Sequence, residues 1–252
     1  MRIKLAQLSI SSHISENKNK IIDVINNTSK NTVIIFPEGM LTGYYPDTKN
    51  FLQYIDRKML ATSIEEIVEM SKKSACAVIF GGISFERDHA YNCSYLTYMG
   101  TTHEYRKCNL STLDRNHFYP GNKIDSYTIL GTIIGIQMCR ENAFPEQWIY
   151  LKALGAKVVF HINNAVAQHD GKKRHLLISR AMENQMFVVS VNTINENGPL
   201  PSLVINPYGD IVYEAPLYTE DIQELEINLN EVKDEYLNQK RIDLLNVISN
   251  LS

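Results

Sequence analysis

Three residues whose types can together hydrolyse a carbonyl compound lie at the ends of strand-like segments in this chain of 252 residues. Glu38 follows a short apolar run ended by a proline, Lys107 follows a second strand-like segment and Cys139 follows a third. A thiol attacks as its thiolate and therefore needs a base such as a carboxylate, and an ammonium group can stabilise the oxyanion that forms. Because ligands of α/β folds tend to bind beyond the carboxyl ends of strands, the three residues are candidates for one thiol-hydrolase site.

Each of these residues also has an ordinary structural explanation. Glu38 and Lys107 could be solvated charges at strand ends, and Cys139 could be a buried structural thiol. A helix is expected soon after Cys139, and its backbone N–H groups would favour a thiolate and a developing oxyanion. The spacing along the chain does not by itself show that the three side chains meet.

The segments that must position these residues alternate between strand-like and helix-like patterns. Strands are predicted at residues 3–8, 32–36, 77–80, 91–98, 102–106, 127–130, 132–137, 157–160, 186–191, 202–205, 211–213 and 222–227. Helices are predicted at residues 15–27, with Ser15 as the N-cap, and at 54–75, 145–154, 173–185 and in the tail from 231. This order indicates an α/β layered architecture, and two similar sheets covered by helices would fit it. No linker divides the chain, so residues 1–252 are expected to form a single domain.

Composition excludes several other classes of protein. Apolar residues make up 44% of the chain, its net charge is -3 and its Lys and Arg residues are dispersed, so nucleic-acid binding is not expected. There is no apolar run of about 18–20 residues and no secretory signal, which favours a cytoplasmic protein without a membrane segment. The four cysteines form no CxxC pair, and histidines 161, 169 and 175 lack the spacing of a zinc hydrolase, so free thiols and no metal are expected.

A family resemblance strengthens the assignment of the three residues. Residues 36–44, 105–110 and 135–146 resemble, in order and separation, the three sequence blocks of the nitrilase superfamily of carbon–nitrogen hydrolases. Residues 118–121, 180–185 and 205–209 are also similar to that family, so the resemblance covers nearly the whole chain. It implies a four-layer α-β-β-α sandwich, a homodimer or larger homo-oligomer, no metal or organic cofactor, and a catalytic triad at Glu38, Lys107 and Cys139.

The resemblance also implies a reaction. Cys139 would attack a non-peptide C–N compound and form a thioester, with Glu38 moving the proton. Lys107 and the backbone N–H of Arg140 would stabilise the oxyanion. We expect a small amide or N-carbamoyl substrate that releases an acid and ammonia or an amine. A nitrilase, acyl transfer to an amine, and a catalytically silent binding or scaffold protein remain alternatives.

Two positions depart from the family pattern. Many relatives carry a second glutamate six residues before a Pro-Gly pair, and here that position is Asp114, which could orient Lys107 or the substrate, or simply sit in a turn. Many amidase-type relatives have an arginine or aromatic residue four positions after the cysteine, and here Ala143 could leave additional room.

Other residues are expected to contact the substrate. The segment 161–168 lacks the proline and tryptophan that are frequent in relatives, and its Asn163 and Asn164 could bind substrate or cap a helix. Arg140 would favour an acidic substrate if its side chain faces the pocket. Tyr44 could line the pocket mouth, or could simply pack.

Overall fold

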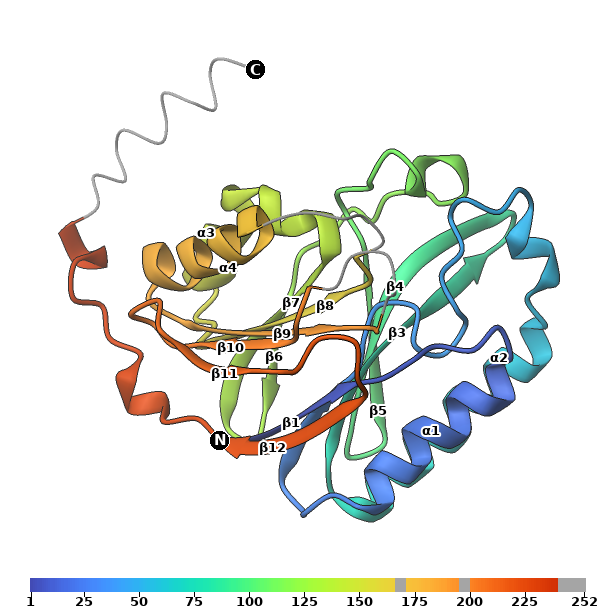
Figure 1. Ribbon diagram of the computed structural model, residues 1–252, viewed down its shortest axis with the longest axis horizontal. Coiled ribbons are helices and arrows are strands. Elements are labelled where there is room, and N and C mark those ends of the chain that lie inside the picture. The colour runs from blue at the N-terminus through green and yellow to red at the C-terminus, as the bar shows by residue number, and fades with distance from the viewer. Residues whose placement is uncertain (166–170, 195–199, 240–252) are drawn as a thin grey trace.

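The chain folds into two six-stranded sheets in a computed structural model, which describes residues 1–165, 171–194 and 200–239 (Figure 1). The first sheet has the strand order β12 (Asp221–Glu226), β1 (Arg2–Gln7), β2 (Thr32–Ile35), β3 (Ala77–Glu86), β4 (His89–Tyr98), β5 (Thr101–Arg106). The second sheet has the order β11 (Ile211–Glu214), β10 (Leu203–Ile205), β9 (Phe187–Asn192), β8 (Val158–Asn163), β7 (Thr132–Met138), β6 (Ser126–Ile129). In each sheet three neighbouring strands are parallel, β1–β2–β3 and β7–β8–β9, and the remaining pairs are antiparallel.

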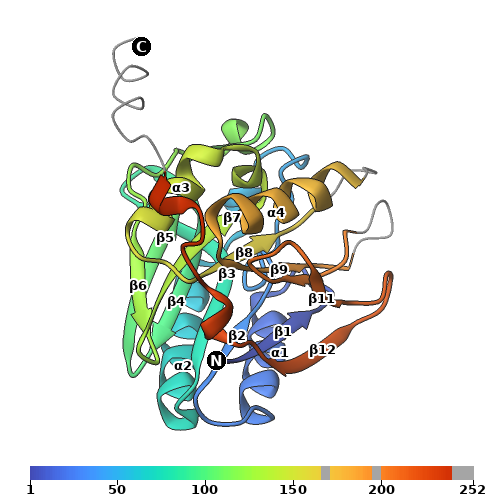
Figure 2. The same ribbon diagram turned by 90° about the vertical axis from the view of Figure 1, so that its left-hand side faces the viewer.

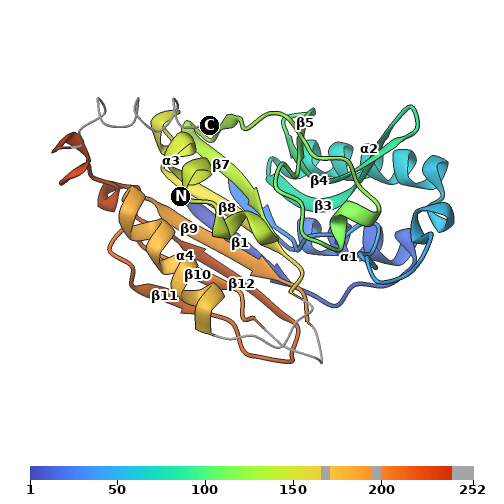
Figure 3. The same cartoon turned by 90° about the horizontal axis from the view of Figure 1, so that it is seen from above.

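Helices cover the outer face of each sheet. The helices α1 (Ile14–Asn26) and α2 (Arg57–Ser74) pack on the first sheet, and α3 (Pro145–Ala153) and α4 (Gly171–Asn184) pack on the second. Figure 2 shows the two helix pairs on opposite sides of the molecule, and Figure 3 shows α4 lying along β9 and β10. The predicted four-layer α-β-β-α sandwich is therefore confirmed.

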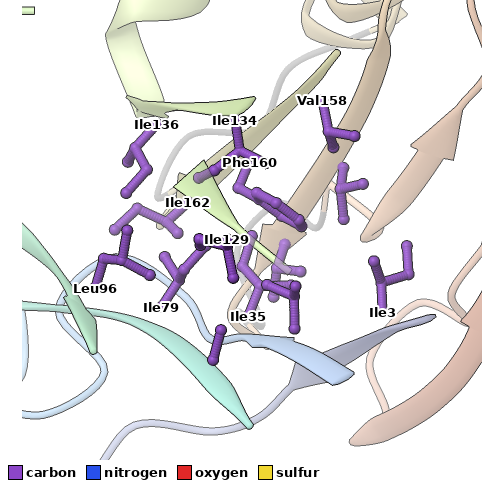
Figure 4. Packing of buried hydrophobic residues seen from close by; sticks show 14 of the residues in the cluster. Ile3, Ile35, Ile79, Leu96, Ile129, Ile134, Ile136, Val158, Phe160 and Ile162 are labelled. Atoms are coloured by element: carbon purple, nitrogen blue, oxygen red, sulfur yellow. The ribbon is translucent and has the colours of Figure 1, made fainter. Parts of the chain in front are cut away.

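The main apolar core lies between the two sheets. Ile35 and Ile79 of the first sheet face Ile134 and Phe160 of the second, and all four side chains are inaccessible to solvent (Figure 4). Their neighbours along the strands, such as Ile34, point the other way and pack under the helices. The short β-branched strands are thus buried on both faces, which explains why they read as continuous apolar runs.

The structure differs from the sequence predictions at helix ends. The segment 54–75 is not one helix: a short 3-10 turn, Phe51–Tyr54, precedes α2, and Asp56 caps α2 by accepting hydrogen bonds from the N–H groups of Lys58 and Met59. The N-cap of α1 is His13 and not Ser15. An aspartate before a helix is a strong cap, and the apolar periodicity alone did not reveal this break.

The C-terminal tail also departs from its prediction. Between residues 228 and 239 the chain forms only two 3-10 turns, Leu229–Glu231 and Leu237–Gln239, and the rest of the predicted tail helix lies outside the described residues. Across the described ranges, no helix combines the length and apolar character needed to cross a membrane.

Candidate active site

A buried cluster of charges joins three of the predicted site residues. The Lys107 Nζ atom lies 2.8 Å from Glu38 Oε1 and 2.8 Å from Asp114 Oδ2, and all three side chains are inaccessible to solvent. Burial alone would lower the pKa of Lys107, but the surrounding negative charges, that of Glu38 first, hold it well above its usual value. Burial would likewise raise the pKa of Asp114, but the Lys107 ammonium holds it below its usual value. Lys107 is therefore a fixed cation between two carboxylates.

A close backbone contact fixes the position of Glu38. The loop that follows β2 lies directly on β3, where the N–H of Leu41 donates to the carbonyl of Gly81 at 2.9 Å. A Cβ atom at Gly81 would lie 2.3 Å from the backbone nitrogen of Gly39, so no larger residue fits there. A glycine in the middle of an otherwise apolar strand therefore lets the Glu38 loop approach.

A second close contact holds the segment that carries Lys107. The N–H of Lys107 donates to the Asn92 carbonyl at 2.9 Å, which continues the β4–β5 ladder, and its carbonyl accepts from the N–H of Gly121 at 2.8 Å. A Cβ atom at Gly121 would lie 2.2 Å from the Arg106 carbonyl oxygen. The Pro-Gly pair of the sequence motif thus brings the returning loop against the lysine backbone.

Asp114 reaches Lys107 from this loop in spite of its short side chain. It begins a 3-10 turn, Asp114–Asn116, and its carboxylate accepts from the N–H of Ser111 at 2.9 Å, while its own N–H donates to Ser111 Oγ at 3.1 Å. The Tyr44 hydroxyl donates to the other carboxylate oxygen at 2.7 Å. Asp114 therefore belongs to the cluster as well as to a turn.

Asn92 also belongs to this cluster, although it is not among the residues predicted from the sequence. Asn92 lies in β4, and its Nδ2 donates to Glu38 Oε1 at 2.8 Å and lies 3.4 Å from Asp114 Oδ1. The second oxygen of Glu38 accepts from the backbone N–H of Asn164 at 3.1 Å. These contacts set the orientation of the Glu38 carboxylate. A buried amide within an apolar strand is the signal that could have revealed Asn92.

Cys139 occupies a strained backbone position at the end of β7. Its φ of 40° lies in the left-handed region, where non-glycine residues are uncommon, and it begins a 3-10 turn, Cys139–Ala143. Its carbonyl lies 3.1 Å from His161 Nε2, and because a carbonyl only accepts, that nitrogen carries the proton. Burial lowers the pKa of His161 to about 4, so the ring is neutral near pH 7.

The electrostatic setting of the Cys139 thiol differs from the expectation. From the sequence, nearby N–H groups are expected to favour the thiolate. Instead, burial, followed by the negative charge of Glu38, raises the pKa of Cys139 to about 11, and the positive charges of Lys107 and Lys173 offset this only in part. The resting thiol is therefore protonated, and any attack by Cys139 requires a base.

A second buried carboxylate, that of Glu141, joins the segment after β5 to the segment before Cys139. It accepts hydrogen bonds from the N–H groups of Met138 at 2.9 Å, Cys108 at 2.8 Å and Asn109 at 3.1 Å, and from the Tyr105 hydroxyl at 2.9 Å. Burial raises its pKa to about 7, although these donors act in the opposite direction. We call these contacts the Glu141 clamp. Its signal in the sequence is an acidic residue two positions after the cysteine, inside the block 135–146.

Cys139 opens into a cavity of about 390 Å³. Of the residues expected to contact substrate, Tyr44, Arg140, Ala143 and Asn164 line it, whereas Asn163 is buried in β8 and is not among the lining residues. The other described residues that line it are Ser111, Thr112, Leu113, Asn142, Ala165, Lys172, Lys173 and Leu176. The cavity is therefore of a size and lining that suit a small polar molecule. Residues 166–168 of the segment 161–168 lie outside the described residues.

No metal site accompanies this arrangement in the part of the chain that the structure describes. Among residues 1–165, 171–194 and 200–239, no three His, Cys, Asp or Glu side chains are grouped as metal ligands.

Comparisons with known proteins agree with this fold. Residues 2–234 match the carbon–nitrogen hydrolase family. An (R)-stereoselective amidase from Pseudomonas sp. is 26% identical over 97% of this chain and 93% of its own length, and a nitrilase from Pyrococcus abyssi is 24% identical over 94% of both chains. The solved structure of a Nesterenkonia AN1 amidase of the nitrilase superfamily has the same fold, with a TM-score of 0.84 and 18% identity over 98% of this chain and 96% of its own. The chain belongs to the carbon–nitrogen hydrolase family.

Proposed function

We propose that this protein is a thiol amidase that cleaves the non-peptide C–N bond of a small amide or N-carbamoyl compound. One observation carries the proposal: Cys139 lines the cavity, and the fully buried pair of Glu38 and Lys107 acts electrostatically on its thiol. A nucleophile at the cavity surface, with a carboxylate and an ammonium close to it, is the arrangement that acyl transfer to a thiol requires.

The proposed first half-reaction begins with proton transfer from the Cys139 thiol to the Glu38 carboxylate. The sulfur attacks the carbonyl carbon, and the tetrahedral oxyanion is stabilised by the Lys107 ammonium and the backbone N–H of Arg140. Removing one such donor typically costs about 3–4 kcal/mol of transition-state stabilisation. The C–N bond then breaks, Glu38 returns its proton to the departing ammonia or amine, and the acyl group remains on sulfur as a thioester.

The second half-reaction hydrolyses the thioester. Glu38, again a carboxylate, takes a proton from water as the water oxygen attacks the thioester carbon. Collapse of the second oxyanion releases the carboxylic acid, and Glu38 returns the proton to the sulfur. Lys107 stays an ammonium throughout because neighbouring negative charges hold its pKa well above its usual value. Asp114 acts here as a positioning residue, since it contacts the ammonium that binds the oxyanion.

The proposed function is tested by removing the Cys139 thiol and by detecting the acyl group that it should carry. Cys139→Ala is expected to fold normally and to lose all turnover, and mass spectrometry of the wild type with substrate is expected to show an acyl adduct on Cys139. Ammonia release from a panel of amides, ureido acids and nitriles identifies the substrate class. The matched control is Cys76→Ser, because Cys76 lies directly before β3, does not line the cavity, and its thiol donates to the backbone carbonyls of Ser29 and Ser74. Turnover in Cys139→Ala, or an adduct on another residue, contradicts the proposal.

A nitrilase is the second candidate, because a relative of that name aligns over nearly the full length of both chains. A nitrile also reacts with a thiol, but the product is first a thioimidate and not a thioester. The same panel separates the two reactions, since only a nitrilase releases ammonia from the nitriles. Acyl transfer is detected by adding an amine acceptor, and a protein without turnover on any member of the panel fits the binding or scaffold alternative.

A further inference from the structure

The cavity at Cys139 is lined by several cationic side chains. Arg140, Lys172 and Lys173 contribute to its wall, and none of the described residues that line it is Asp or Glu. The carboxylates of Glu38 and Asp114 lie beneath the wall, where Lys107 already pairs with both. The described part of the cavity wall therefore carries cations and no carboxylate.

The two lysines occupy unfavourable positions in α4. Lys172, Lys173 and Arg174 follow Gly171 in the first turn of this helix, which contains no acidic residue. Cations near a helix N-terminus are disfavoured because the helix dipole is positive there. Arg174 is compensated by an ion pair with Glu214 of β11, whereas no carboxylate of the described residues pairs with Lys173. Local rules of this kind are most often broken where function requires it.

Lys173 lies close to the reacting atom as well as to the cavity. Its side chain is half-buried, and its charge is one of the two that lower the pKa of the Cys139 thiol. A cation in this place attracts an anion on the bound molecule, and such a charge-assisted contact is stronger when the cavity has excluded water.

We propose that Lys173, together with Arg140, forms an anion subsite, and that the natural substrate is an amide or N-carbamoyl compound that also bears a carboxylate. This inference rests on the proposed amidase function and names the substrate class for the same site. Lys173 would hold the carboxylate while the amide carbon faces Cys139, so that substrate charge determines selectivity.

The experiment compares matched substrates that differ only in this charge. The monoamides malonamate, succinamate and glutaramate carry one carboxylate, and the corresponding diamides replace it with a neutral amide of the same shape. For at least one chain length, wild type is expected to show a kcat/KM for the monoamide at least about 10-fold above that for the diamide. In Lys173→Met the ratio is expected to fall by about 10- to 100-fold, mainly through KM, and Lys173→Arg is expected to restore most of it.

Two controls separate binding of the anion from general damage. Arg174→Met removes a neighbouring cation that is paired away from the cavity, and it is expected to leave the ratio unchanged. Raising the salt concentration is expected to raise KM for the monoamide and not for the diamide. Arg140→Met is expected to lower the ratio in the same direction as Lys173→Met.

The outcomes distinguish this inference from the proposed function. Equal kcat/KM values for monoamides and diamides, unchanged in Lys173→Met, overturn the anion subsite and leave the amidase intact. If wild type hydrolyses no amide, the proposed function fails, and the subsite is then tested by calorimetric titration of succinate into wild type and Lys173→Met. Binding of succinate that is about 10-fold weaker in the variant supports the subsite, and equal binding or no binding to wild type overturns it.

Discussion

Two fully buried glutamates, Glu38 and Glu141, lie near the same cysteine but have opposite kinds of partners. Glu38 is neutralised by the Lys107 ammonium and oriented by an amide and one backbone N–H. Among the described residues, Glu141 forms no ion pair and is surrounded by three backbone N–H groups and a tyrosine hydroxyl. The first arrangement keeps a charge close to the thiol, and the second joins two backbone segments. Carboxylates in one buried region can therefore have different roles according to whether side chains or backbone groups bind them.

The largest effect is expected from a substitution of Glu38, which removes the charge close to the thiol. Glu38→Gln keeps the shape of the side chain but removes the base, and because burial raises the pKa of the Cys139 thiol to about 11, little thiolate forms without that base. We expect kcat/KM to fall by at least about 10³-fold when it is measured at a temperature where the variant is folded. Steady-state ammonia release measures this loss. A variant within tenfold of wild type would show that another group takes the proton.

The next effect concerns pH, because Glu141 and His161 respond to it in opposite directions. Burial raises the pKa of Glu141 from 4.5 to about 7, so its contribution to stability is present below pH 4.5 and is lost as the pH rises to 7. Burial lowers the pKa of His161 from 6.5 to about 4, so its contribution is present above pH 6.5 and is lost as the pH falls to 4. Each amounts to about 3 kcal/mol, since a tenfold change in proton affinity corresponds to about 1.4 kcal/mol. In wild type, between about pH 4.5 and 6.5, the two opposite changes in the free energy of unfolding with pH nearly cancel.

Single variants should separate these slopes. Glu141→Gln is expected to lose stability on acidification, because only the His161 dependence remains, and His161→Asn is expected to lose it as the pH rises towards 7. Urea unfolding at about pH 4.5, 5.5, 6.5 and 7.5 measures the free energy of unfolding for each protein. If the free energy of unfolding of both variants changes with pH in the same way as that of wild type, neither Glu141 nor His161 titrates as its burial requires.

A smaller effect comes from the hydrogen bonds of the Glu141 clamp at constant pH. In Glu141→Gln an NH₂ group takes the place of one carboxylate oxygen and leaves the N–H of Met138 or Cys108 without an acceptor. An unsatisfied buried donor costs about 1–3 kcal/mol of stability. We also expect kcat to fall by about tenfold with little change in KM, because the turn that carries Cys139 loosens while the cavity wall remains. An unchanged kcat would mean that the clamp has no part in positioning the nucleophile.

The residues at the ends of strands could be predicted from the sequence, but the contacts that they make with residues of other strands could not. Glu38, Lys107 and Cys139 were identified because each follows a strand and lies in a motif, and both features are local. Asn92 and the partners of Glu141 were missed because they depend on which strands are neighbours, and pairing is set by long-range packing. The same limit applies to Lys173, which approaches the cysteine only because α4 packs over the second sheet.

The pKa of Cys139 shows what local reasoning about charge left out. The sequence indicates the N–H groups of the following turn, which favour a thiolate. It does not indicate the removal of the thiol from water or the proximity of Glu38, which raise the pKa of the thiol and depend on the folded structure.

The smallest expected effect comes from the hydrogen bond between Tyr44 and Asp114, at the periphery of the charged cluster around Glu38. The Tyr44 hydroxyl donates to Asp114 at 2.7 Å, and burial raises the tyrosine pKa, so the hydroxyl remains a donor. Tyr44→Phe removes this hydrogen bond but leaves Asp114 with Lys107 and the Ser111 N–H, so we expect a loss of about 1 kcal/mol in the free energy of unfolding and a fall in kcat of less than about tenfold. Urea unfolding and ammonia release measure both quantities. If kcat instead falls as far as in Glu38→Gln, the hydroxyl takes part in the reaction, and the charged cluster extends to the cavity wall.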